Sequence, residues 1–126
     1  MMTENEISKI IVDRCLHIHR SLGPGLLESV YETVLEFELM KLDFMVDRQK
    51  IMPLVWEGIA FDHCYRADLI VNGRVLIEVK SVAAVAPVHL KQVQTYLILS
   101  KIKLGLLINF NEELMKFGIH RVVNRL

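Results

Sequence analysis

The sequence has little of several features that would indicate a particular class of protein. Its 126 residues include only two cysteines, Cys15 and Cys64, whose spacing fits neither a metal site nor a disulfide framework. Basic and acidic side chains number 15 each, and the resulting net charge of zero excludes a general electrostatic attraction to nucleic acid or lipid. No apolar run is long enough to cross a bilayer, and residues 1–6 do not resemble a signal peptide. We therefore expect a cytoplasmic protein without membrane contact.

The residues that are present describe a globular chain. Hydrophobic residues make up 52% of the sequence and charged residues 24%, which is typical of a protein that buries a core. A chain of 126 residues is long enough for one such core and too short for two. We expect a single domain over residues 1–126.

Hydrophobic periodicity predicts an α/β fold, with a mixed central sheet flanked by helices in the order α-α-β-β-β-α-β-β. Thr3 and Glu6 match a capping box that opens a helix over residues 4–20. Pro53 should place a strand over residues 45–56 at a sheet edge or a bulge. The apolar run at 102–109 fits a central parallel strand reached by a crossover helix from Pro87 to about residue 101. A last strand is expected over residues 115–123.

A second helix follows the Gly/Pro break at residues 21–25 and runs to about residue 42. Its expected core-facing stripe consists of Leu27, Val30, Tyr31, Val34 and Leu35. Glu28, Glu32 and Glu36 stack on an adjoining face, and such a stack is usually solvated. Glu28 lies in the first turn, where the helix dipole favours an acidic residue, and it could also supply a carboxylate to a neighbouring site.

Asn72-Gly73 is the strongest hairpin signal and joins two strands within residues 65–80. A strict two-residue loop would place Asp68 opposite Ile77, whereas one more loop residue, with a bulge near Gly73, places Asp68 opposite Glu78. The longer loop is favoured because it keeps one face wholly apolar. That face carries Ala67, Leu69, Val71, Val75, Ile77 and Val79. The opposite face carries Arg66, Asp68, Ile70, Leu76, Glu78 and Lys80.

Two carboxylates and an ammonium group thus converge on one face of a mostly apolar hairpin. Buried charges must be paired or coordinate a metal, and Mg²⁺ commonly uses one or two protein carboxylates together with water and phosphate. Lys80 could orient a water or offset charge on a phosphate. The alternative is a charged face on which Lys80 forms an ion pair with a carboxylate.

Other polar residues give weaker signals. Gln92 and Tyr96 lie one turn apart on the predicted helix and could both hydrogen-bond a phosphate or a metal-bound water. His17 and His19 cannot share a helix face, so we expect surface or packing roles for them. The His-Cys pair at residues 63–64 is expected to be structural.

Together these motifs resemble the core of the PD-(D/E)xK nuclease superfamily, in which a helix bearing an acidic residue precedes an Asp…Glu-x-Lys hairpin, a helix and a buried strand. More narrowly, four segments resemble signatures of the small GxxExxY family. They are Gly25-Leu-Leu-Glu28-Ser-Val-Tyr31, Tyr65-Arg66-Ala67-Asp68, Ile77-Glu78-Val79-Lys80-Ser81 and residues 104–110. Gln92-x-x-x-Tyr96 is similar to a motif of the exonuclease-like branch. The similarity spans residues 7–123, and Ala67 replaces the proline that names the superfamily.

The resemblance implies a restriction-endonuclease-like core and a Mg²⁺ or Mn²⁺ cofactor. Asp68 and Glu78 would bind the metal, with the backbone carbonyl of Val79 as a further ligand. The other implied catalytic residues surround that metal: Glu28 as an accessory carboxylate, Lys80 to position the attacking water, and Gln92 and Tyr96 to contact phosphate or solvent.

We therefore expect a Mg²⁺-dependent phosphodiesterase, a nuclease that acts on DNA or RNA by attack of an activated water on phosphorus. The alternative is a catalytically silent module that binds nucleic acid or protein and retains the nuclease fold. A structural α/β domain without a site is the third hypothesis. A homodimer formed through an exposed sheet edge would gather basic surface for nucleic acid. The candidates for that surface are Arg66, Lys91, Lys116, Arg121 and Arg125.

Overall fold

The structure is a computed structural model that describes residues 1–62 and 65–126. His63 and Cys64 lie outside the described residues. The structural role expected for this pair therefore concerns residues that the structure does not describe. The elements in chain order are α1 (Glu4–Leu22), α2 (Glu28–Lys41), β1 (Val46–Trp56), β2 (Ile59–Val71), β3 (Val75–Lys80), α3 (Pro87–Ser100), β4 (Leu104–Asn109), the 3₁₀ turn η1 (Met115–Phe117) and β5 (Ile119–Val123). This is the predicted order with η1 added.

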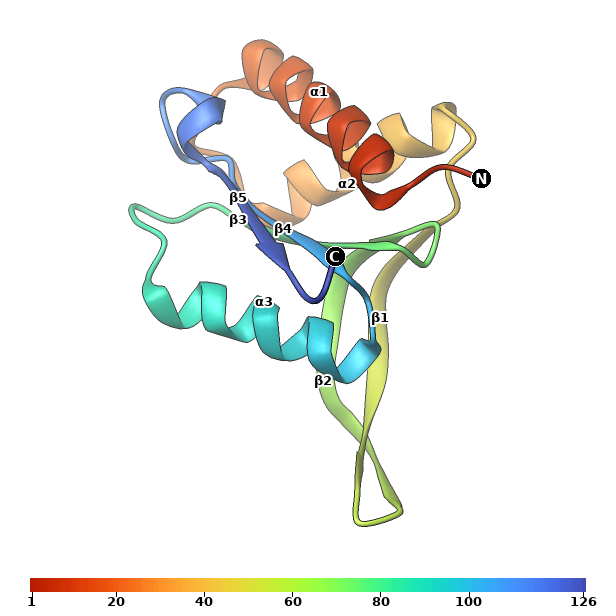
Figure 1. Cartoon of the computed structure of the whole chain (residues 1–126). Helices are drawn as coiled ribbons and strands as arrows, with labels where there is room; N and C mark the ends of the chain where they lie inside the picture. The colour runs from red at the N-terminus through yellow and green to blue at the C-terminus, as the bar shows by residue number, and fades with distance from the viewer.

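The strands form one five-stranded sheet in the order β1-β2-β3-β4-β5. β3 and β4 are parallel, as predicted for a pair joined by a crossover helix, and the other neighbours are antiparallel. Helices α1 and α2 cover one face of the sheet and α3 covers the other (Figure 1). The predicted mixed α/β fold is therefore confirmed. None of the helices in the described part of the chain combines the length and apolar character needed to span a bilayer.

Helix α1 begins where the capping box predicts. The Thr3 hydroxyl accepts a hydrogen bond from the Glu6 amide at 3.2 Å, and the Glu6 carboxylate accepts one from the Thr3 amide at 2.9 Å. The helix then buries an apolar stripe against the sheet, formed by Ile7, Ile11, Cys15 and Ile18. Cys15 is a buried free thiol.

β1 is an edge strand, and its register against β2 shifts between Met52 and Leu54. Pro53 therefore lies both at an edge and at a bulge, the two positions predicted for it. Beyond this shift the two strands form a ribbon that projects from the body of the molecule (Figure 1). The apolar side chains of Trp56 and Ile59 near its tip are exposed.

The predicted core stripe of α2 is partly wrong. Tyr31 and Leu35 are buried, but Leu27 and Val30 are exposed. A long-range contact sets the rotation of the helix: the Tyr31 ring stacks on the ring of Phe110 with centroids 4.4 Å apart. The Tyr31 hydroxyl also donates to the Gly23 carbonyl at 2.6 Å. The face of α2 that follows Tyr31 into the core carries Leu35, Leu39 and two glutamates, Glu32 and Glu38.

The strand expected over residues 115–123 is wrong in its first part, because residues 115–117 form η1 and the strand starts at Ile119. Between them the backbone of Gly118 packs directly on β4. The Asn109 amide donates to the Gly118 carbonyl at 2.8 Å, and a Cβ on Gly118 would lie 2.2 Å from the Asn109 carbonyl oxygen. This close approach requires glycine and interrupts the extended backbone.

Candidate functional site

The hairpin between β2 and β3 has the predicted longer loop. Its paired residues run from Leu69 and Ile77 to Val71 and Val75, so the same register places Asp68 opposite Glu78. The loop residue Asn72 has a φ of 52°, within the left-handed region that a turn of this kind requires. The predicted register is therefore confirmed.

Beyond that paired segment, side chains take the place of the backbone ladder. Asp68 Oδ2 accepts a hydrogen bond from the Val79 amide at 2.8 Å, and Glu78 Oε1 accepts one from the Asp68 amide at 3.3 Å. Both carboxylates consequently lie between β2 and β3, and we call this place the fork. The Val79 carbonyl, the third predicted metal ligand, belongs to the residue whose amide binds Asp68.

One residue of the predicted apolar face lies on the wrong side. Ala67 packs with Ile70 and Leu76 in the cluster that faces α3, whereas Leu69 packs in the cluster beneath α1 and α2. Strict alternation would put Ala67 and Leu69 together. The alternation of β2 side chains between the two faces of the sheet is therefore interrupted at Asp68, the position where the pairing of β2 with β3 ends.

Glu78 is buried, with 5% of its surface exposed. Burial, followed by the nearby Asp68 carboxylate, raises the pKa of Glu78 to about 8, and Lys80 only partly opposes this. The carboxyl is thus largely protonated at neutral pH while no cation is bound. A cation beside the two carboxylates would favour its ionised form.

Lys80 ends β3 and is half-buried. Its backbone carbonyl accepts a hydrogen bond from Phe110 at 2.9 Å, which fixes the end of the strand. Within the described residues, no ion pair joins Lys80 to Asp68 or Glu78. The alternative arrangement, an ion pair between Lys80 and a hairpin carboxylate, is therefore not present among the described residues.

Tyr96 of α3 faces the fork. Burial raises the pKa of its phenol, and the charges of Glu78 and Asp68 raise it further. The Tyr96 ring stacks on Tyr65 of β2 with centroids 4.7 Å apart. Tyr65 opens one of the four segments that carry the family resemblance, but the sequence analysis gave it no role. Gln92, one turn before Tyr96, is exposed.

Glu28 is the first residue of α2 and is half-buried. The helix glutamate that connects to the fork is Glu32, one turn later, which was expected on a solvated face but is 5% exposed. Gln49 Nε2 donates to Glu32 Oε1 at 2.6 Å and to Asp68 Oδ1 at 3.1 Å. Arg48 Nε lies 3.3 Å from the same Glu32 oxygen. Sequence reasoning missed both Glu32 and Gln49.

The donor set at the fork fits a hard divalent cation. Asp68 and Glu78 offer carboxylate oxygens. Burial raises the pKa of Glu78 and the Asp68 charge raises it further, and a cation would offset that repulsion. Across residues 1–62 and 65–126, no group of three or more His, Cys, Asp or Glu side chains is placed to hold a metal. Two carboxylates, with the remaining positions left to water and substrate, are a donor set that a cation such as Mg²⁺ takes in proteins.

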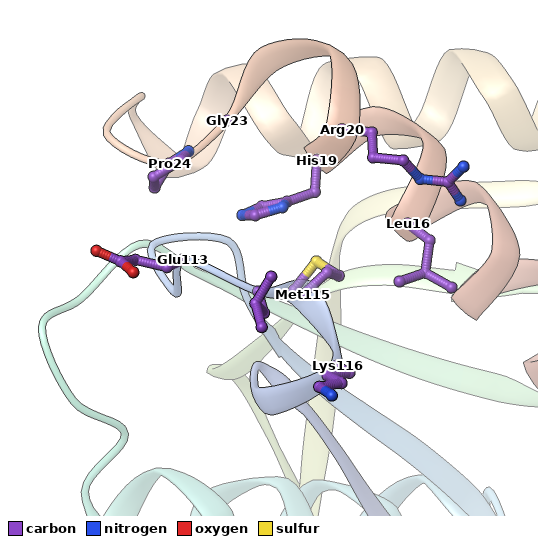
Figure 2. A pocket seen from close by; sticks show the side chains of 9 residues that line it. Leu16, His19, Arg20, Gly23, Pro24, Glu113, Met115 and Lys116 are labelled. Carbon is purple, nitrogen blue, oxygen red and sulfur yellow. The ribbon is translucent and has the colours of Figure 1, made fainter.

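A cavity of about 520 Å³ lies away from these carboxylates, between the end of α1 and the segment around η1 (Figure 2). Its lining includes Leu16, Pro24 and Met115, with Arg20 and Lys116 as basic residues. Figure 2 shows the His19 ring extending from α1 toward the space between Pro24 and Glu113. His19 is buried with Nε2 2.7 Å from the Glu112 carbonyl, and His17 is exposed, in agreement with the roles expected for them.

Comparisons with known proteins identify a family and a similar fold. The sequence profile of the PD-(D/E)XK nuclease superfamily matches residues 5–122. A search of curated proteins found no significant match. The crystal structure of SSO0001 superimposes with a TM-score of 0.50 at 17% sequence identity, covering 95% of this chain and 79% of that one. At this identity the likeness concerns the fold alone.

Proposed function

Because the chain belongs to the PD-(D/E)XK nuclease superfamily, we propose that it is a phosphodiesterase that hydrolyses DNA or RNA with Mg²⁺ or Mn²⁺. The observation that carries the proposal is the pair of carboxylates at the fork, where Asp68 and Glu78 lie opposite each other and share hydrogen bonds with the backbone. The narrower assignment to the GxxExxY family rests on the segments around Glu28, Asp68 and Glu78.

In this proposal Asp68, Glu78 and the Val79 carbonyl hold the cation. A bound divalent cation would draw charge from a phosphoryl oxygen and lower the pKa of a bound water. Lys80, at the end of β3 beside these groups, binds and orients the water that attacks phosphorus. The bond from phosphorus to the leaving oxygen breaks in the same displacement, the attacking water releases a proton to solvent, and the leaving oxygen takes up a proton from solvent.

The side chains around the fork position the substrate. The Tyr96 phenol, whose raised pKa keeps its proton at neutral pH, donates a hydrogen bond to a phosphate oxygen. Gln92, exposed one turn away, contacts a neighbouring phosphate or solvent. Glu28, at the start of α2, serves as the accessory carboxylate that orients water.

Binding of a polyanion needs basic surface that a neutral chain supplies only locally. The exposed candidates are Arg66, Lys91, Lys116, Arg121 and Arg125. A homodimer through an outer strand of the sheet would double this surface, and a gel-filtration mass equal to that of the monomer would exclude it. The net charge of zero favours the second candidate function, a binding module without turnover.

The test is cleavage of labelled single- and double-stranded DNA and RNA with Mg²⁺, with Mn²⁺ and with EDTA. We expect cation-dependent cleavage that falls by roughly 10²-fold or more in Asp68→Asn and Lys80→Ala, since each removes several kcal/mol of transition-state stabilisation. Circular dichroism should show that both variants fold. If the native chain binds neither cation, even with an oligonucleotide present, the enzyme proposal is wrong and the binding module is favoured.

A further inference from the structure

Gln49 has a backbone conformation that is unusual within a β-strand. It lies within β1, between the pairs Arg48–Leu69 and Lys50–Ala67, and therefore opposite Asp68. Its φ is 52°, in the left-handed region that residues with a side chain rarely adopt and that glycine adopts freely. A strained residue persists only where its surroundings hold it in place, and such residues are common at functional sites.

The side chain of Gln49 connects two carboxylates. Its Nε2 carries two hydrogens and lies 2.6 Å from Glu32 Oε1 and 3.1 Å from Asp68 Oδ1. Both acceptors are carboxylate oxygens, and a single amide group is the bridge between them. Glu32 is buried on α2 and is itself held by Arg48, so the bridge has a fixed anchor.

The Asp68 carboxylate is consequently held at both oxygens. Oδ2 accepts from the Val79 amide at 2.8 Å and Oδ1 accepts from Gln49. Each carboxylate oxygen has a further lone pair after one hydrogen bond. The two donors therefore fix the rotation of the group and leave a lone pair on each oxygen for a cation. Partners of this kind orient metal ligands and strengthen metal binding.

We infer that Gln49 and Glu32 are positioning residues that hold Asp68 ready for a divalent cation. This inference rests on the proposed function at the same site and adds to it two residues that neither the sequence motifs nor the comparisons indicate. The left-handed backbone is the structural cost of placing an amide at this point of an edge strand. Position 49 carries glutamine although glycine would adopt this backbone conformation without strain.

The decisive variant is Gln49→Gly, which removes the amide while suiting the backbone. Two quantities are measured on the full chain: Mn²⁺ affinity by calorimetry, and hydrogen exchange of the Val79 amide by NMR without cation. Glycine relieves the left-handed backbone, but the substitution also removes the amide donor from two carboxylates, so we expect thermal stability close to that of the native chain. We also expect a 10- to 100-fold loss of Mn²⁺ affinity, and exchange of the Val79 amide that is faster than in the native chain while exchange at Ile77 is unchanged.

Glu32→Gln and Glu38→Gln form a matched pair on the same helix. Glu32→Gln keeps an oxygen acceptor for Gln49 but loses its charge, and should weaken Mn²⁺ binding severalfold. Glu38 contacts Arg14 and Lys41 rather than the fork, so Glu38→Gln should leave Mn²⁺ affinity unchanged. Equal effects of the two substitutions on Mn²⁺ affinity would contradict the inference.

The outcomes separate the inference from the function it rests on. Native Mn²⁺ affinity in Gln49→Gly, with Val79 exchange unchanged, overturns the positioning role. A loss of affinity that merely follows a loss of thermal stability also overturns it. Mn²⁺ binding that depends on Gln49 without any cleavage of nucleic acid supports the positioning role and overturns the proposed activity. A native chain that binds no cation overturns both.

Discussion

Glu32 and Glu38 lie on the same helix, expose 5% and 7% of their surface, and each contacts an arginine. Their pKa values nevertheless move in opposite directions. A hydrogen bond from Lys41, whose Nζ lies 2.7 Å from Oε2, lowers the pKa of Glu38, and Arg14 lowers it further. Cations cover Glu38 from two sides, which favours its ionised form.

Burial raises the pKa of Glu32, and the Asp68 carboxylate raises it further against the hydrogen bond from Gln49 and the charge of Arg48. The two glutamates thus distinguish two regions of the molecule. Around Glu38, opposite charges are paired and contribute to stability. Around Glu32 and the fork, like charges are brought together, an arrangement that a bound cation would relieve.

The largest effect that follows from this comparison concerns Glu78. Burial and the nearby Asp68 carboxylate raise its pKa from 4.5 to about 8. The folded chain keeps this carboxyl protonated at pH 7, whereas the unfolded chain ionises it. The group therefore lowers the free energy of unfolding increasingly as pH rises from about 4.5 to 8. We predict that Glu78→Gln raises that free energy by roughly 3 kcal/mol at pH 7, measured by urea unfolding without cations.

The gain in Glu78→Gln should disappear near pH 4, where the carboxyl is protonated in the folded and the unfolded chain alike. The control is therefore the same pair of unfolding curves at the lower pH. A gain of equal size at both pH values would show that packing, rather than ionisation, makes the glutamate unfavourable.

The second effect is on cation binding. Glu78 must lose its proton to bind a cation, so the association constant for Mn²⁺ should rise about tenfold between pH 6 and pH 7 and level off above its pKa of about 8. Calorimetry across this range measures the slope. Glu38→Gln should retain the same slope because Glu38 lies outside the fork. A native affinity independent of pH would mean that Glu78 is not a ligand.

The sequence predicted the elements whose signals are local. The capping box at Thr3 sets the start of α1, Asn72-Gly73 sets the hairpin, and Pro53 marks both the edge and the bulge of β1. The register that brings Asp68 opposite Glu78 followed from apolar alternation alone. The fold class and the two carboxylates of the fork were therefore predictable from patterns within a few residues.

The rest of the site depends on contacts between distant segments. Tyr31 stacks on Phe110, a contact that no local pattern encodes, and the rotation of α2 that goes with it places Glu32 inside and Val30 outside. Three glutamates at a spacing of four are equivalent in sequence until that rotation is known. Gln49 carries no local signal either, because its role depends on a left-handed backbone inside a strand.

The third prediction concerns the paired region. The pKa of Glu38 is lowered by Lys41 and Arg14, so its contribution to stability is present above the unfolded pKa of 4.5 and is lost as pH falls through the folded value. Glu38→Gln should lower the free energy of unfolding at pH 7 by about 0.5–1 kcal/mol, the usual range for ion pairs near the surface. Added salt should reduce the difference. If Glu38→Gln leaves the free energy of unfolding at pH 7 unchanged, the contrast between the region around Glu38 and the fork does not hold.

The smallest effect on stability is expected for Glu32→Gln, because opposing contributions cancel. The amide oxygen of the new side chain still accepts from Gln49, so no buried donor loses its partner. The attraction to Arg48 is weakened, but the cost of burying a charge beside Asp68 disappears as well. We predict a change within about 0.5 kcal/mol in urea unfolding at pH 7. A loss as large as that of Glu38→Gln would mean that Arg48 makes Glu32 a structural carboxylate like Glu38. A near-zero change combined with weaker Mn²⁺ binding would mean that Glu32 serves the fork rather than the fold.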